Sequence, residues 1–470
     1  MNKILACMAI VFAFCNAQAK VRMASLFNDG MILQQQSEVK VWGWAKPNSK
    51  VTLTGTWNKK KVTCQSGSDG KWEARMQTPA ASFTPYELTV SDGEKLTIKD
   101  VLIGEVWLGS GQSNMEMPLV GYNSCPIEGL NEEINECRRY KGKIHFVTVS
   151  HLAPLTPADS VKALWKDCTP ENIWDCSATC YFFAKTLVDA MDCPVGVISS
   201  AWGGTSVEGW TPADIVKDYD DADLSEENLK KNVWNTPVVR YNGKIHPLAG
   251  YTLKGFLWYQ GEANRDWPDK YAARLGNMVK AWRKAWGQGD LPFYEVEIAP
   301  FGYDDPNKIS GALLREAQHD FTKQVANTGM ISTNDLVNDY EIWQIHPCKK
   351  REVGQRLCYL ALSKTYGKKG YMAESPEYDK MEIKDGKAYL SFTHCEYGFN
   401  RFDYIKGFEI CGADKVFHTA NVRIENNRAI VSSPDVKEPV AVRYCFKNWQ
   451  PGNLGNVGGM PIIPFRTDRN

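Results

Sequence analysis

The sequence carries no excess of charge of either sign. Among its 470 residues, 55 lysines and arginines balance 55 aspartates and glutamates. A chain without net charge has no global field that would draw it to nucleic acid or to an anionic membrane. We therefore expect no nucleic-acid partner, and a ligand that is neutral or recognised by local groups.

Closely spaced cysteine pairs are also missing. None of the 14 cysteines forms a CxxC pair, which argues against a zinc site. Without Cys7 and Cys15, which fall in the N-terminal leader described next, twelve cysteines remain, an even number compatible with disulfides in an oxidising compartment. Some pairing, with open connectivity, is expected within one cluster: Cys125, Cys137, Cys168, Cys176 and Cys180.

Long hydrophobic runs are absent after residue 19, so the sequence predicts no membrane span. Residues 1–19 fit a secretory signal peptide, because Lys3 precedes an apolar core and Ala17-Gln-Ala19 resembles a cleavage site. We expect a mature chain that starts at Lys20 and is exported, either to the periplasm or as a secreted protein.

Short alternating runs of polar and apolar residues fill both ends of this mature chain. Turn signals such as Asp69-Gly70 separate the runs, as in all-β structure. They predict an N-terminal β-sandwich-like module over residues 20–100 and a C-terminal β module over residues 373–470. Trp42 and Trp44 could bind sugar in the first module, but packing in its core is the favoured interpretation.

Residues 101–372 instead alternate apolar strands with amphipathic helices. This alternation predicts a mostly parallel sheet with helices on both faces. Ligands of such sheets bind at the carboxyl ends of the strands. The expected strands are 101–108, 144–149, 194–199, 253–259 and 291–298, and the expected helices are 178–191, 269–286 and 309–322.

The turn after the first of these strands contains a candidate nucleophile. Glycines at 109 and 111 break the strand just before Ser113. A serine at the carboxyl end of a central strand, near backbone N–H groups of a following helix, suits a reaction whose intermediate carries negative charge. An ordinary polar turn has the same local pattern, so Ser113 needs support from other loops.

Three further loops supply chemically suitable groups. Gly203 and Gly204 follow one predicted strand, and their N–H groups could approach a ligand closely. Gln260 and Glu262 follow another strand and add an amide and a carboxylate. His346 stands where a loop meets a helix-like segment.

These four loops resemble the sialate O-acetylesterase family of the SGNH hydrolase superfamily. The resemblance implies a flavodoxin-like three-layer α/β/α hydrolase domain over residues 101–372, flanked by the two all-β modules. It implies neither a metal nor a cofactor. The matching blocks are Gly111-Gln-Ser-Asn-Met115, Trp202-Gly-Gly-Thr205, Trp258-Tyr-Gln-Gly-Glu262 and Ile345-His-Pro347.

The same resemblance implies roles for individual residues. Ser113 would be the nucleophile, and His346 the base that accepts its proton. Glu262 would support the loop of Gln260. The oxyanion hole would combine the N–H of Ser113, an N–H of Gly203 or Gly204, and the side-chain amide of Gln260.

One position departs from the family pattern. An aspartate usually stands two or three residues before the histidine and orients it, but Trp343 and Gln344 occupy those positions here. Exchanging such an acid for an amide costs about ten-thousand-fold in a serine protease. Either a Ser-His dyad operates, or a backbone carbonyl or one of four side chains orients the ring: Asp335, Asp339, Glu341 or Gln344.

A second Ile-His-Pro sequence offers an alternative base. His246 lies in Ile245-His-Pro247, but it precedes the Gln260 block, which is the wrong order for the family base. We expect packing or surface roles for it and for the other histidines: His145, His151, His319, His394 and His418.

The expected function is that of an exported serine esterase that removes O-acetyl groups from a carbohydrate. Sialic acid is the namesake substrate of the family. Two alternatives stay open: an acetylesterase of plant polysaccharides such as xylan or pectin, and a carbohydrate-binding protein whose esterase site has decayed.

Overall fold

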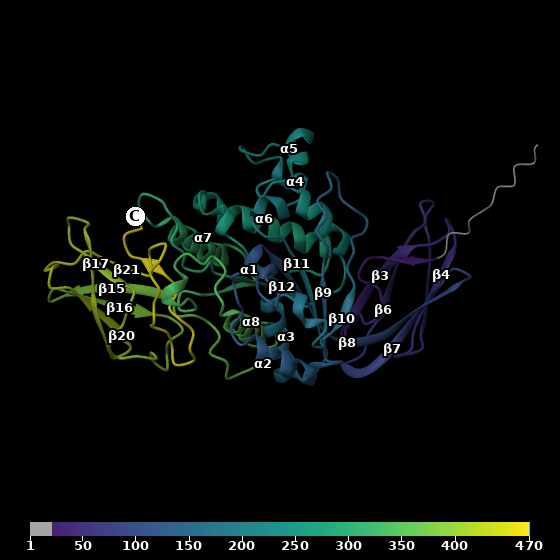
Figure 1. Ribbon diagram of the computed structural model, residues 1–470, viewed down its shortest axis with the longest axis horizontal. Helices are drawn as coiled ribbons and strands as arrows, with labels where there is room; N and C mark the ends of the chain where they lie inside the picture. The colour runs from purple at the N-terminus through teal and green to yellow at the C-terminus, as the bar shows by residue number, and fades with distance from the viewer. Residues whose placement is uncertain (1–20, 470) are drawn as a thin grey trace, which may run out of the picture.

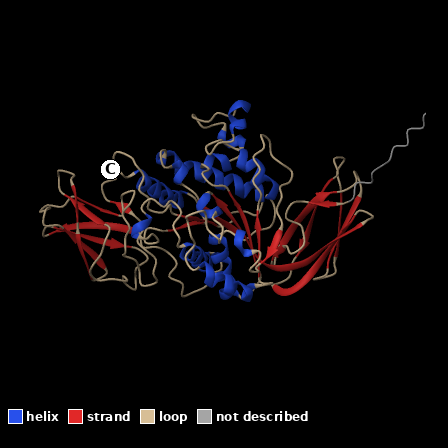
Figure 2. Ribbon diagram, in the orientation of Figure 1, coloured by secondary structure: helices blue, strands red, loops and turns tan. Residues whose placement is uncertain are grey.

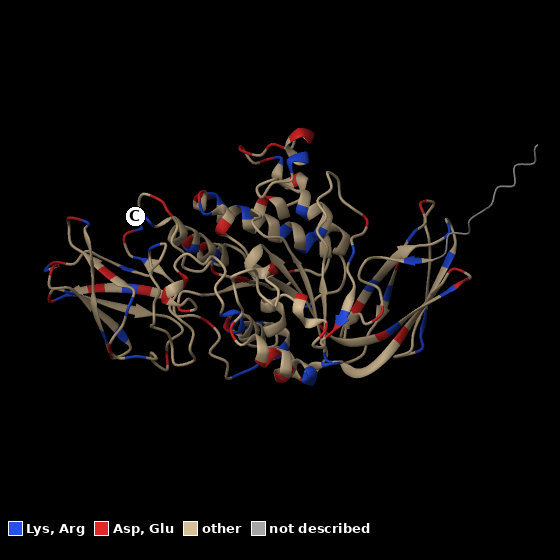
Figure 3. Cartoon of the chain, in the orientation of Figure 1, with Lys and Arg blue, Asp and Glu red and all other residues tan. Residues whose placement is uncertain are grey.

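The computed structural model describes residues 21–469 and has three parts in a row, with strands at both ends and mixed helices and strands between them (Figure 1). The predicted signal peptide, residues 1–19, lies outside the described residues. Among the described helices, none is long and apolar enough to cross a membrane. Charges of both signs are interspersed over all three parts (Figure 3), in line with the balanced composition.

Two sheets form the N-terminal part and share one apolar core. Every second residue of strands β3 and β6 is buried, as expected for sheets with one covered face. The first sheet contains β1 (Arg22–Met23), β3 (Glu38–Trp44) and β6 (Lys71–Gln77); the second contains β2 (Ile32–Gln34), β4 (Lys50–Gly55), β5 (Lys61–Gln65), β7 (Ser82–Ser91) and the first half of β8 (Lys95–Gly111).

Strand β8 crosses the predicted boundary at residue 100 without a break. Its first half pairs with β7 in the N-terminal part. Its second half is fully buried from Val101 to Gly111 and pairs with the central strands β11 and β12. One continuous strand therefore joins the N-terminal sheets to the centre of the molecule.

The central sheet has the predicted parallel arrangement. Five neighbouring parallel strands run in the order β11-β8-β12-β13-β14, which is 2-1-3-4-5 in chain order and thus flavodoxin-like. Strand β9 pairs parallel with β11, and β10 closes the edge antiparallel. The bounds are β9 (Ile144–Thr148), β10 (Trp165–Asp167), β11 (Val195–Ala201), β12 (Gly255–Tyr259), β13 (Phe293–Val296) and β14 (Thr328–Ile331).

Helices cover both faces of this sheet, which confirms the three-layer prediction (Figure 2). Along β12, Phe256 and Trp258 join the core under α6 and α7, whereas Leu257 and Tyr259 join the core under α3 and α8. The long helices are α3 (Ala178–Met191), α6 (Pro268–Trp286), α7 (Ser310–Gln324) and α8 (Lys350–Lys364). The short ones are α1 (Ser113–Glu116), α2 (Leu130–Glu136), α4 (Ala213–Val216), α5 (Glu226–Lys231), η1 (Cys137–Tyr140), η2 (Ile173–Asp175), η3 (Val207–Trp210), η4 (Tyr241–Ile245), η5 (His246–Leu248), η6 (Glu262–Asn264) and η7 (Asp339–Glu341).

The C-terminal part consists of two four-stranded antiparallel sheets around a separate apolar core, as its sequence predicts. One sheet contains β15 (Tyr378–Lys384), β16 (Lys387–Phe392), β20 (Arg428–Ser432) and β19 (Asn421–Glu425); the other contains β18 (Phe417–Thr419), β17 (Phe408–Cys411), β21 (Ala441–Tyr444) and β22 (Phe465–Arg466).

The expected disulfides are absent, because all twelve cysteines between residues 21 and 469 are free. Four members of the cysteine cluster, Cys137, Cys168, Cys176 and Cys180, are buried in the core beside α3 instead. Burial raises the pKa of the Cys180 thiol to about 11. These thiols therefore act as small apolar core groups, and the prediction of pairing is wrong.

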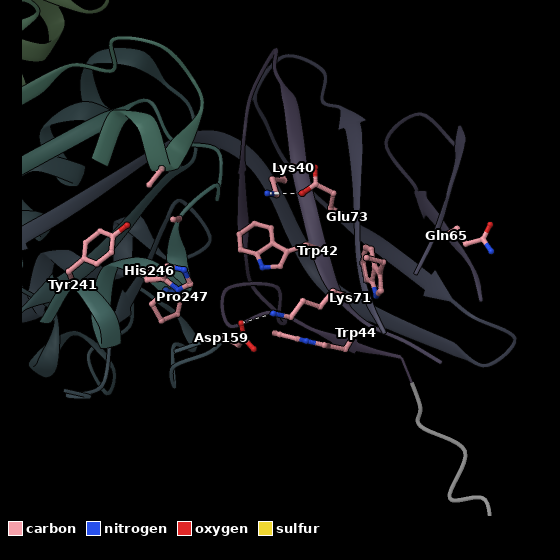
Figure 4. A pocket seen from close by; sticks show the side chains of 14 residues that line it. Lys40, Trp42, Trp44, Gln65, Lys71, Glu73, Asp159, Tyr241, His246 and Pro247 are labelled. Atoms are coloured by element: carbon pink, nitrogen blue, oxygen red, sulfur yellow. Dashed lines mark hydrogen bonds and ion pairs between the residues drawn. The ribbon is translucent and has the colours of Figure 1, made fainter. Parts of the chain in front are cut away.

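A cavity of about 680 Å³ lies between the N-terminal sheets and the central part (Figure 4). Trp42 and Trp44 line it, and both also pack at the edge of the N-terminal core. The rings of Phe27 and Trp42 meet edge to face, with their centroids 4.8 Å apart. His246, the alternative base, lines the opposite wall with its Nδ1 3.0 Å from the carbonyl oxygen of Ala158.

Candidate active site

Three adjacent strand ends bring the predicted loops together. Gly111 at the end of β8 is paired with Ala201 of β11 on one side and with Tyr259 of β12 on the other. Gly111 has φ +134°, and a Cβ there would lie only 2.2 Å from the Tyr259 carbonyl oxygen, so the turn requires glycine. The loops that carry Ser113, the 203–204 glycines and Gln260 therefore start side by side.

Ser113 begins the short helix α1 and is half-buried. Its hydroxyl has no hydrogen-bond partner within residues 21–469, while its carbonyl oxygen accepts a 3.0 Å hydrogen bond from the Tyr122 hydroxyl. The hydroxyl is thus not committed to another protein group. A serine nucleophile is activated when its hydroxyl donates to the base, so this bond has to form when substrate arrives.

The His346 loop lies against this turn. Asn114 donates from Nδ2 to the Ile345 carbonyl oxygen at 3.0 Å, and the rings of Tyr122 and His346 meet edge to face with centroids 5.0 Å apart. The residues next to Ser113 therefore contact the residues next to the histidine. The structure brings both predicted catalytic residues into one site, although 233 positions separate them in the sequence.

The histidine is held in its neutral form. Burial, and after it the nearby positive charge of Lys350, lowers the pKa of His346 to about 4. Lys350 is itself buried and donates from Nζ to the Pro347 carbonyl oxygen at 2.5 Å. A neutral imidazole can accept the proton of a serine hydroxyl, whereas an imidazolium cannot.

This pKa sets the expected pH dependence. The base is active only while His346 is neutral, so kcat/KM should fall as the pH drops through about 4 rather than through the usual histidine value near 6.5. Hydrolysis of p-nitrophenyl acetate, followed from about pH 3 to about pH 7, measures this acid limb. An acid limb near the usual histidine value would contradict the assignment.

Among the four predicted orienting side chains, Gln344 is the one that is hydrogen-bonded to His346 itself. Its Oε1 accepts from the His346 backbone N–H at 3.3 Å and from the Cys125 thiol at 3.1 Å. Its Nε2 donates to the Ser124 carbonyl oxygen at 3.2 Å. The Cys125 sulfur also lies 3.9 Å from Nδ1 of His346. Gln344 and Cys125 together therefore hold the His346 loop in place.

The three carboxylates have other positions. Glu341 accepts from the backbone N–H groups of Asn338 and Cys348 at 2.7 and 3.0 Å. Asp335 forms a two-bond pair with Arg356. The third, Asp339, is exposed. The orienting role stays a prediction for each of the three carboxylates, but Glu341 and Asp335 already accept hydrogen bonds from other groups.

Gln344→Ala should therefore lower kcat by about 10- to 100-fold, because a misplaced base costs that much when the chemistry itself is intact. Asp339→Ala is measured beside it and should change kcat less than twofold, because its side chain is exposed; a loss in Asp339→Ala alone would give the orienting role to Asp339. Steady-state acetate release by both variants tests this, with melting temperatures to show that each is folded. Equal rates for Gln344→Ala and the parent would contradict it.

The predicted oxyanion donors differ in availability. The backbone N–H groups of Ser113 and Gly204 donate to no acceptor within residues 21–469. Gly203 lies against the serine, since a Cβ there would be 3.4 Å from Ser113 Cβ, but its N–H donates to Glu116 Oε2 at 2.6 Å. Ser113 and Gly204 therefore hold the free donors of this turn.

Gln260 and Glu262 are both buried in hydrogen-bond networks. Gln260 donates from Nε2 to the Thr205 carbonyl oxygen at 3.0 Å and to Asn264 Oδ1 at 2.7 Å. An oxyanion role for Gln260 would require one of these bonds to break, and it stays a prediction. Burial raises the pKa of Glu262, which accepts from Asn114 Nδ2 at 2.7 Å. Glu262 thus supports the residue next to Ser113.

Two residues at this site were not found from the sequence. Glu116 Oε1 lies 2.5 Å from His151 Nε2, and the His151 ring stacks on Trp202 at 4.0 Å with 7° between the planes. The guanidinium of Arg240 lies over Trp202 as well, 4.6 Å from its ring. Glu116 stands one helical turn after Ser113, so its spacing was a usable signal. His151 had none, because only the fold brings it close.

Comparison with known proteins shows which family the chain resembles over most of its length. Residues 103–363 match the family described as carbohydrate esterase, sialic acid-specific acetylesterase. Human sialate O-acetylesterase is 28% identical over 491 residues, covering 94% of this chain and 90% of the human protein, and the mouse enzyme is 27% identical over 498 residues, covering 91% and 90%.

A solved structure is similar over the whole described chain. The crystal structure of a carbohydrate acetylesterase from Xanthomonas citri has a TM-score of 0.85 and 33% sequence identity, and the match covers 96% of this chain and all of that one. The family match spans more than half of the 470 residues. The chain therefore belongs to the sialic acid-specific acetylesterase family of carbohydrate esterases, and it is an esterase.

Proposed function

We propose that this esterase removes O-acetyl groups from sugars by a Ser113–His346 mechanism. The observation that supports the proposal is the contact of the two loops through Tyr122 and Asn114, because Tyr122 meets both the Ser113 carbonyl oxygen and the His346 ring. Nucleophile and base within one site are the minimum for acyl transfer through a covalent intermediate.

In the first step, the Ser113 oxygen attacks the acetyl carbonyl carbon while His346 takes the hydroxyl proton. The carbonyl oxygen becomes an oxyanion, which the N–H groups of Ser113 and Gly204 can stabilise. The intermediate then collapses, the bond to the sugar oxygen breaks, and the imidazolium returns the proton to that oxygen. The products of this step are the free sugar alcohol and acetyl-Ser113.

In the second step, water replaces the sugar. His346 removes a proton from a water molecule, whose oxygen attacks the acetyl carbonyl of the acyl-enzyme. Collapse breaks the bond to the Ser113 oxygen, which regains the proton from the imidazolium. Acetic acid leaves, and the site returns to its starting state.

The proposed substrate is O-acetylated sialic acid. Support comes from the description of the family and from the names of the human and mouse relatives. An acetylated polysaccharide such as xylan is the second candidate, because the similar Xanthomonas citri enzyme is described only as a carbohydrate acetylesterase. We also propose export, on the strength of the signal-peptide pattern in residues 1–19.

Acetate release from O-acetylated sialic acid and from acetylated xylan, measured in parallel with residues 20–470, tests the substrate. We expect faster release from the sialic acid, with Ser113→Ala as the blank for both. Faster release from xylan would reassign the substrate class. No release above the blank from either would contradict the proposed function and favour a decayed site.

A further inference from the structure

Two exposed tryptophans lie beside the catalytic loops. Trp234 and Trp267 are 44% and 41% exposed, and their rings stack with centroids 6.5 Å apart and 24° between the planes. Paired aromatic rings on a surface leave apolar area in water, which usually marks a binding surface. The exposed area of these rings contributes little to the stability of the fold, so we expect the rings to contact a ligand.

The position of this pair follows from its backbone contacts. A Cβ at Gly204 would lie 3.8 Å from Trp234 Cβ, and the Trp234 carbonyl oxygen accepts from the Ser206 N–H at 3.2 Å. The Trp267 N–H donates to the Asn264 carbonyl oxygen at 2.9 Å. Both tryptophans are therefore attached to the two loops that follow β11 and β12 at the site.

A cavity of about 320 Å³ opens next to Trp267. Polar residues line it beside the aromatic ring, among them Asn228 and Asn235. Glu208 and Arg274 also line it and form a 2.7 Å ion pair. An aromatic wall with a few fixed polar groups is the usual composition of a small-molecule site, and it suits a sugar ring with one apolar face and hydroxyls around its edge.

The charged residues that line this cavity indicate which class of sugar it can bind. Three carboxylates line it, from Glu208, Asp221 and Asp223, against the lining Arg274 and against Lys270, which pairs with Asp221 at 3.0 Å. Both hydrogen-bonded partners of Arg274, Glu208 and Asp221, are among these carboxylates. An anionic sugar would meet repulsion here, whereas the hydroxyls of a neutral sugar can donate to the carboxylates.

We propose that Trp234, Trp267 and this cavity bind a neutral sugar unit of the glycan whose acetyl ester is cut at Ser113. The proposal rests on the proposed esterase function and extends it, because it places a second sugar unit beside the acetylated one. Trp234, Trp267 and the cavity thus favour an acetylated oligosaccharide over a free acetylated monosaccharide as the substrate.

Kinetics on two kinds of ester test this subsite. Trp267→Ala should raise KM for acetylated xylo-oligosaccharides or for O-acetylated sialyl oligosaccharides about tenfold, as expected for loss of an aromatic anchor. It should leave kcat/KM for p-nitrophenyl acetate unchanged, because that ester has no second sugar. Trp267→Phe should restore most of the affinity, since the aromatic face is kept.

Trp174→Ala is the matched control, since Trp174 is 46% exposed and does not line the cavity. Trp174→Ala should change neither the KM for the oligosaccharides nor kcat/KM for p-nitrophenyl acetate. Equal loss on p-nitrophenyl acetate and on the oligosaccharide in Trp267→Ala would overturn the proposal, because it would indicate damage to the catalytic loops. An unchanged KM for both oligosaccharides would overturn it as well.

A binding measurement separates this subsite from the esterase function. Ser113→Ala protein should bind deacetylated xylo-oligosaccharides or mucin-type O-glycans in calorimetry, and Trp234→Ala or Trp267→Ala in that background should weaken binding about tenfold. The better-bound glycan identifies the source of the neutral sugar. Lack of binding to both glycans would overturn the subsite even if acetate release is intact.

Discussion

Ser113→Ala lowers the rate of acetate release by about a million-fold, the loss expected when the nucleophile of a serine hydrolase is removed. Tyr122 holds the carbonyl oxygen of Ser113 and not its hydroxyl, so the replacement leaves this contact intact. The measurement is kcat with p-nitrophenyl acetate and with an acetylated sugar. Residual rates then reflect only the remaining donors and substrate binding.

Ser110→Ala is the control for this result. Ser110 lies three residues earlier in β8, is fully buried, and donates from Oγ to the Ser200 carbonyl oxygen at 2.6 Å. Its replacement should cost about 1 kcal/mol of stability through the lost hydrogen bond, while the parent rate is kept. A Ser113→Ala protein that releases acetate as fast as Ser110→Ala would rule out Ser113 as the nucleophile.

His346→Ala should also lower kcat by about a million-fold, because serine and base act as one unit. For the same reason, the double variant with Ser113→Ala should be no slower than either single variant. His151, the other histidine described at this site, is paired with Glu116, so it is not available to replace His346. Both rates are measured at neutral pH.

The chain contains its own matched control for this experiment. His246 stands in the same Ile-His-Pro sequence but lines the 680 Å³ cavity beside the N-terminal sheets, where its ring meets the Ala158 carbonyl oxygen. His246→Ala should keep the parent rate within about twofold. A large loss in His246→Ala together with a small loss in His346→Ala would reverse the assignment of the base.

Sequence periodicity predicted most of the central fold. The expected helix over 178–191 coincides with α3, and the strand expected over 144–149 matches β9 to within one residue. These segments are long or strongly apolar, so a local pattern is enough. Strand β14 was missed, because its four residues, Thr328–Ile331, include a glycine and are too few to show a period.

Features that depend on distant contacts were predicted less well. The cysteine cluster suggested disulfides, but Cys137, Cys168, Cys176 and Cys180 are free thiols buried in the core beside helix α3. The availability of the predicted oxyanion donors also depends on distant contacts, since Glu116 takes the Gly203 N–H and Thr205 and Asn264 take the Gln260 amide. Motifs identify which residues meet, whereas hydrogen-bond geometry decides which of their groups are free.

Strand β8 makes the N-terminal module mechanically inseparable from catalysis. Its seventeen residues start among the N-terminal strands and end two residues before Ser113. The strand is irregular where the two parts meet, because Asp100 has a φ of +54° and the pairing with β7 shifts register. Backbone pairing on both sides of this irregularity nevertheless ties the N-terminal sheets to the turn of the nucleophile through a single strand.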